Sequence, residues 1–185
     1  RAGGYADPTQ LLALNRIMDR AMKGHPHVKS AIDMACWDIL GKVTGKSVCD
    51  LMGGKFGESV ALYRAISQRS TDEMAENVAA HRADGYTKFQ LKVGGRPGDD
   101  IDRIHAVADI LANGEVLVAD ANTGWRVDDA IRVVNAVRDR DVYIEQPCRS
   151  YEHCLTIRRR TSLPFILDEN ITGIDALLRG HADGA

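Results

Sequence analysis

Four polar residues occupy matching places in the sequence, each at the end of an apolar segment. Lys92 closes "KFQLK", Asp120 closes "VLVAD", Glu145 closes "VYIE" and Asp168 closes "PFILD", at separations of 28, 25 and 23 residues. Three carboxylates that converge repel one another unless a cation neutralises them. Carboxylate oxygens are the ligands that Mg²⁺ prefers in proteins. The pattern therefore predicts a site for Mg²⁺ or another divalent cation at Asp120, Glu145 and Asp168.

Lys92 adds a candidate base to this set. A partly desolvated lysine beside a divalent cation gives up its proton more readily than it does in water, so it can act near neutral pH. A base and a metal together suit abstraction of a proton α to a carboxylate, because the metal stabilises the enediolate charge. We therefore expect a small-molecule carboxylate substrate. Two other interpretations stay open: a Schiff-base lysine aldolase, and a binding or structural protein whose acids have lost their metal.

Each of these residues also has a purely structural interpretation. Asp120 can form an Asx turn with the residues that follow it, and Lys92 can be a solvated strand end. Asp168 or Glu169 can cap a helix that starts near Gly173. The recurrence of polar residues at four successive strand ends favours the functional interpretation.

The elements that position these residues alternate between two types from residue 60 onward. Amphipathic segments, one of them opened by a capping box at Ser70, separate five apolar segments. We predict the apolar segments to be strands, namely Val60–Ile66, Lys88–Val93, Val116–Asp120, Val142–Glu145 and Phe165–Asp168. This alternation predicts an α/β fold with a parallel sheet. An open doubly wound sheet fits it too, but polar residues at successive strand ends favour a (β/α) barrel, where working residues lie at those ends.

Residues before the first strand are predicted to be helical. Asp7 is expected as the N-cap of one helix with Pro8 at its first position, and a second helix ends near Gly45. We assign residues 1–57 to the end of a capping domain and residues 58–185 to the first five βα units of a barrel. A complete barrel needs roughly 250 residues. More chain beyond Ala185, or another subunit, is therefore expected to cover the sheet edges.

The composition excludes several other classes of protein. The chain has 185 residues, 44% hydrophobic and 27% charged, with a net charge of −2, so it offers no basic surface for nucleic acid. No apolar run approaches the ~20 residues of a membrane span. The four cysteines show no CxxC spacing and are expected to be free thiols of a cytoplasmic protein.

Several motifs together resemble the enolase superfamily, specifically the mandelate racemase/muconate lactonizing enzyme subgroup. "SAIDMACWDILGKVTGKSVCDLMGG" resembles the segment that joins the capping domain to the barrel, and "FQLKVGG", "DANTGW", "EQP" and "DE" resemble the site motifs. The resemblance implies that Lys92 is a base and that Asp120, Glu145 and Asp168 bind the metal. It places Gln90, Asn122 and Glu169 beside these groups or the substrate.

The resemblance also implies a fold and an activity. The fold would be a TIM-like (β/α)7β barrel preceded by helices of a capping domain, in a homo-oligomer. The motif combination is most similar to cis-3-hydroxy-L-proline dehydratases, while racemases or epimerases of amino-acid derivatives and muconate-type cycloisomerases are the alternatives. Two features depart from the family pattern. Gln90 stands where the strand-two motif carries a first lysine, and the opposite base would lie beyond Ala185.

Overall fold

A computed structural model describes residues 7–185, and the described chain divides into two compact units at the boundary between Val60 and Ala61. The first unit contains the helices α1 (Leu11–Ala21), α2 (Pro26–Thr44) and α3 (Val48–Leu51). Side chains link α1 to α2, since Asn15 Nδ2 donates to Asp33 Oδ1 over 2.7 Å. The division of the chain at residues 57 and 58 stays a prediction.

The start of α1 differs from the sequence prediction. Asp7 does not cap the helix, and Pro8 is not helical, because the Asp7 carboxylate accepts hydrogen bonds from Thr9 N and Oγ1 at 2.9 and 2.6 Å. This local turn uses the side chain that would have capped the helix. The helix begins at Leu11, with Gln10 at the N-cap. The predicted end of α2 is confirmed, since Gly45 terminates it at φ +67°, a left-handed conformation that glycine adopts without cost.

The second unit is a five-stranded parallel sheet with helices between its strands. The strands are β1 (Arg64–Ile66), β2 (Lys88–Lys92), β3 (Val116–Asp120), β4 (Tyr143–Glu145) and β5 (Phe165–Ile166). The helices are α4 (Thr71–Ala83), α5 (Pro97–Ala108), α6 (Val127–Ala136), α7 (Tyr151–Arg158) and α8 (Ile174–Asp183).

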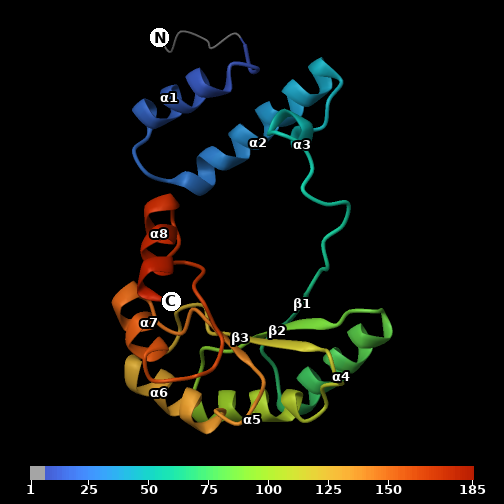
Figure 1. Ribbon diagram of the computed structural model, residues 1–185, viewed down its shortest axis with the longest axis vertical. Coiled ribbons are helices and arrows are strands. Elements are labelled where there is room, and N and C mark those ends of the chain that lie inside the picture. The colour runs from blue at the N-terminus through green and yellow to red at the C-terminus, as the bar shows by residue number, and fades with distance from the viewer. Residues whose placement is uncertain (1–6) are drawn as a thin grey trace. The chain divides into compact units, whose positions relative to one another are not determined.

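Strand order distinguishes the two architectures that the sequence allowed. The strands lie in the order β1-β2-β3-β4-β5, without the reversal that defines a doubly wound sheet. Successive right-handed crossovers in one direction put every connecting helix on the same face. Figure 1 shows α4, α5, α6 and α7 as an arc outside the strands. The second unit is therefore a partial (β/α) barrel.

The strand register separates a packed face of the sheet from a polar one. Side chains of β2 and β3 at alternate positions are fully buried beneath the helices, among them Phe89, Leu91 and Ala119. Because side chains alternate along a strand and paired residues share a face, the residues between them lie on the opposite face. That face carries Gln90 and Lys92.

The predicted strands Lys88–Val93 and Val142–Glu145 are each one residue too long. The first and last predicted strands are too long by two residues or more, for the same physical reason. A strand residue needs a partner on the neighbouring strand, and Arg64 already pairs with Phe89, the second residue of β2. The apolar residues before Arg64 therefore extend past the partner strand. At the other edge, β5 ends at Ile166, which pairs with Glu145, the last residue of β4.

The capping box at Ser70 and the free thiols agree with the sequence predictions. The capping box at Ser70 is present, with Ser70 and Glu73 each bonding the other's backbone N–H. All four cysteines are free, and three of them are buried, the exception being Cys49. Within residues 7–185, no helix combines the length and the apolar character that crossing a membrane requires.

Candidate active site

Three of the predicted site residues lie side by side at the carboxyl ends of neighbouring strands. Lys92 pairs with Asp120 in the β2–β3 register, and Asp120 pairs with Glu145 in the β3–β4 register. Because paired residues of parallel strands share a face, the three side chains form one row. Asp168 follows two residues after the end of β5, beside this row. The sheet thus brings the predicted residues together by its register.

Asp120 is held from two sides. Lys92 Nζ donates to Asp120 Oδ2 over 2.5 Å, and the backbone N–H of Asn122 donates to Asp120 Oδ1 over 2.9 Å. The carboxylate is fully buried, whereas the Lys92 side chain keeps 33% of its surface exposed. Asp120 therefore does form the Asx turn of the structural interpretation. The same turn fixes the carboxylate toward Lys92.

The surroundings of Glu145 shift the pKa of its carboxyl group. Its burial raises the pKa of the Glu145 carboxyl above the ordinary value, and the charges of Asp120 and Asp168 raise that pKa further. Gln90 opposes this shift, because Gln90 Nε2 donates to Glu145 Oε2 over 2.7 Å. Gln90 thus supplies a hydrogen bond where a lysine would supply a positive charge.

The residues after β5 are more exposed than the rest of the row. Asp168 and Glu169 both face solvent, and Asn122 Nδ2 donates to Glu169 Oε1 over 3.2 Å. Neither acid caps α8, because Gly173 is its N-cap and no side chain bonds there. The predicted capping role is therefore wrong.

The donor set fits a hard divalent cation by its chemistry. It consists of carboxylate oxygens only, and the mutual repulsion that raises the Glu145 pKa is what a cation among the carboxylates would relieve. The described arrangement instead directs Lys92 to Asp120 and Gln90 to Glu145. Accordingly, in the part of the chain from Asp7 onward, no three His, Cys, Asp or Glu side chains are grouped as a metal site. Asp120, Glu145 and Asp168 remain the residues that would hold Mg²⁺.

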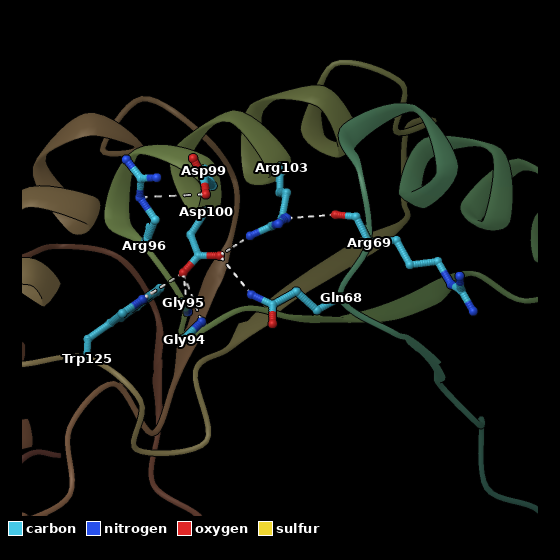
Figure 2. A network of polar contacts seen from close by, with 9 residues as sticks. All are labelled: Gln68, Arg69, Gly94, Gly95, Arg96, Asp99, Asp100, Arg103 and Trp125. Atoms are coloured by element: carbon cyan, nitrogen blue, oxygen red, sulfur yellow. Dashed lines mark hydrogen bonds and ion pairs between the residues drawn. The ribbon is translucent and has the colours of Figure 1, made fainter.

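A buried carboxylate beside this row, Asp100 on α5, escaped the sequence interpretation. Figure 2 shows it at the centre of a polar network that joins three loops. Asp100 Oδ2 accepts from the backbone N–H groups of Gly94 and Gly95 at 3.0 and 2.7 Å, and from Trp125 Nε1 at 2.9 Å. Asp100 Oδ1 accepts from Arg103 Nη1 at 2.8 Å and from Gln68 Nε2 at 3.3 Å. The Asp100 carboxylate thus accepts five hydrogen bonds in all.

The network holds the loops that follow Lys92 and Asp120. Gly94 follows Lys92 by two residues, and Trp125 follows Asp120 by five. These loops touch through their backbones, since a Cβ atom on Gly94 would lie 2.2 Å from the carbonyl oxygen of Ala121. Asp100 therefore fastens the two loops that directly follow Lys92 and Asp120. In the sequence, the "GG" after Lys92 and Gly124 in "DANTGW" signal such close backbone packing, since a Cβ atom on Gly124 would lie 2.4 Å from the carbonyl oxygen of Gly94.

Comparison with known proteins supports the family. The protein-family model described as "Enolase C-terminal domain-like" matches residues 73–185. The family model described as "Mandelate racemase / muconate lactonizing enzyme, N-terminal domain" matches residues 5–53. The chain is 55% identical over 179 residues to a cis-3-hydroxy-L-proline dehydratase of Roseibium aggregatum, covering 97% of this chain and 49% of the relative. It is 32% identical over 171 residues to an N-succinyl-L-Arg/Lys racemase of Bacillus cereus, covering 89% and 46%.

Solved structures give the same result. A mandelate racemase/muconate lactonizing enzyme from Roseovarius nubinhibens matches with a TM-score of 0.87 and 48% identity, over 96% of this chain and 49% of that one. A member of the enolase superfamily from the same organism, complexed with magnesium, matches with a TM-score of 0.85 and 39% identity, over 97% and 49%. The chain spans about half the length of these relatives. It belongs to the mandelate racemase/muconate lactonizing enzyme family of the enolase superfamily.

Proposed function

We propose that the protein abstracts the proton α to a carboxylate and that its substrate is a cis-3-hydroxy-L-proline-type amino acid, which it dehydrates. One observation carries the first part: the register that places Lys92, Asp120 and Glu145 in one row at the strand ends. The identity of 55% to a cis-3-hydroxy-L-proline dehydratase supports the second. A bound Mg²⁺ would supply positive charge to the substrate carboxylate.

The chain's own residues divide the remaining work. Asp120, Glu145 and Asp168 would hold the cation, and Lys92 Nζ would take the Cα proton. The Cα–H electron pair moves onto the carboxylate to give the enediolate, and its return expels the hydroxyl group from C3. A double bond forms between Cα and C3, and the hydroxyl leaves as water after it gains a proton.

The present pairing of Lys92 sets a condition on this role. Lys92 Nζ lies 2.5 Å from Asp120 Oδ2, so the amine is directed at this carboxylate and not at a substrate. Lys92 therefore becomes a base only when Asp120 engages a different cation. When the cation replaces Lys92 as the partner of Asp120, the same event would bind the metal and free the Lys92 amine to act as a base.

Replacement of Lys92 by Met in the full-length protein tests the assignment. The change keeps the apolar stem and removes the amine; because the cation would take the place of Lys92 at the buried Asp120, the variant should fold and bind Mg²⁺ when Mg²⁺ is present. Exchange of the substrate Cα proton in D₂O with Mg²⁺ should fall by a factor of at least about 10². A variant that keeps near-normal exchange and turnover would exclude Lys92 as the base. Borohydride trapping with the substrate would reveal the aldolase alternative.

A racemase or epimerase of amino-acid derivatives is the second candidate, supported by the 32% identity to the N-succinyl-L-Arg/Lys racemase. Both reactions begin with the same proton abstraction, so only the fate of the enediolate differs. Hydroxyprolines, hydroxyproline betaine, N-acyl amino acids and dipeptides, each incubated in D₂O, separate the candidates. Loss of water marks a dehydratase, whereas deuterium incorporation with inversion marks an epimerase. A homo-oligomer and a cytoplasmic location stay predictions.

A further inference from the structure

Gln146, which directly follows Glu145, has an unusual conformation for its residue type. Its φ is +36°, in the left-handed region that a non-glycine side chain seldom adopts, and the residue is fully buried. Such backbone strain costs on the order of 1–3 kcal/mol and persists only where neighbouring contacts enforce it. The contacts of Gln146 therefore indicate what the strain maintains.

The backbone of Gln146 connects three strand ends. Its N–H donates to the carbonyl oxygen of Ile166 on β5 over 2.9 Å, and its own carbonyl oxygen accepts from Thr123 in the loop after β3 at 2.9 Å. Gln146 thus extends the hydrogen bonding of the sheet by one residue beyond Glu145, toward both neighbouring strands.

The side chain of Gln146 turns toward the loop after β5. Its Oε1 accepts from the backbone N–H groups of Asp168 and Asn170 at 2.8 and 3.4 Å. Its Nε2 donates to Asn170 Oδ1 and to the carbonyl oxygen of Cys148 at 2.6 and 3.0 Å, and lies 3.5 Å from Cys154 Sγ. One amide group therefore ties the segment after Glu145 to the backbone of Asp168.

We propose that Gln146 is a positioning residue that fixes Asp168 relative to Glu145 and thereby sets the affinity for the divalent cation. This inference rests on the proposed function, because Glu145 and Asp168 are the carboxylates assigned to the cation. β5 ends at Ile166. No strand pairing within residues 7–185 therefore holds Asp168, and the bond from its N–H to Gln146 Oε1 takes over that function. Partners that orient a metal ligand typically contribute about 10- to 100-fold in metal affinity.

Gln146→Asn separates positioning from folding. Asparagine tolerates the left-handed conformation better than glutamine does, so the backbone should keep its shape. The shorter side chain cannot reach the backbone N–H of Asp168. Gln146→Met is the second variant, since it keeps the length and removes both polar ends. Ile104→Val, in the buried core of α5, is the control for a general loss of stability.

The measurement is Mn²⁺ affinity of the full-length protein by electron paramagnetic resonance, together with the Tm of the same samples without metal. We expect both Gln146 variants to bind Mn²⁺ at least about 10-fold more weakly, and Ile104→Val to bind as the wild type does even where its Tm falls equally. Wild-type affinity in either folded Gln146 variant would overturn the inference, as would an equal loss in Ile104→Val. If the wild type itself binds no Mn²⁺, the proposed function fails instead, and the two failures are thus distinguished.

Discussion

Replacement of Asp100 by asparagine perturbs the network of Figure 2 with almost no change in shape. The Asp100 side chain is fully buried and accepts hydrogen bonds from five donors. Asparagine keeps one acceptor oxygen and replaces the other by an NH₂ group, which can only donate. If the oxygen stays with Gly94, Gly95 and Trp125, the NH₂ group faces Arg103, which can only donate, and Gln68, whose amide would have to turn to offer its oxygen.

The expected loss of stability follows from these contacts. A hydrogen bond to a charged group contributes about 1.5–3 kcal/mol, and removal of one partner of a buried ion pair costs about 3–5 kcal/mol. Arg103 limits the loss, because its side chain keeps 18% of its surface exposed and still donates to the carbonyl oxygen of Arg69 at 2.8 Å. We therefore expect Asp100→Asn to lower the free energy of unfolding by about 3 kcal/mol.

Urea unfolding of the full-length protein, followed by circular dichroism, measures this difference. Asp99 is a matched control on the same turn of α5, since it lies 4.0 Å from Arg96 and both side chains are exposed, at 53% and 88%. Asp99→Asn should change the free energy of unfolding by no more than about 0.5 kcal/mol. In an Arg103→Met background, Asp100→Asn should cost less than it does alone. Equal, small effects of Asp99→Asn and Asp100→Asn would refute the argument.

Three further changes test other parts of the fold by the same unfolding measurement. Gly94→Ala should destabilise by more than about 4 kcal/mol, because φ is +98° and the new Cβ would lie 2.2 Å from the carbonyl oxygen of Ala121; a loss near 1 kcal/mol would contradict this. A hydrogen bond from Arg82 lowers the pKa of the Glu115 carboxyl in the folded protein. The pair therefore stabilises the fold above pH ~4.3, the ordinary pKa of glutamate, and this stabilisation is lost as the pH falls through the lowered pKa of Glu115. Glu115→Gln should therefore be less stable than the wild type at pH 7, with a smaller difference at pH 3. Ser70→Ala removes the capping box of α4 and should cost about 1 kcal/mol, and no change would mean that the cap is dispensable.

The row of Lys92, Asp120 and Glu145 could be predicted from the sequence because strand ends and βα spacing are local properties. Lys92, Asp120 and Glu145 each end an apolar segment, and parallel register then aligns them without further information. Asp100 could not be found in this way. In sequence it is one of two acids in the first turn of α5, together with Asp99, which is exposed. Only the fold of the loops that carry Gly94 and Trp125 buries one acid and leaves the other in water.

The strand-two departure at Gln90 bears on the charge that the site requires. Lys92 is the one cationic side chain paired with a carboxylate of the row in the described residues, and it neutralises one of three negative charges. A lysine in place of Gln90 would neutralise a second, but the glutamine amide satisfies Glu145 Oε2 with a hydrogen bond and leaves its charge intact. With Lys92 on Asp120, no cationic side chain among the described residues pairs with Glu145 or Asp168. We propose that Gln90 holds Glu145 by a hydrogen bond that puts no competing positive charge beside this carboxylate.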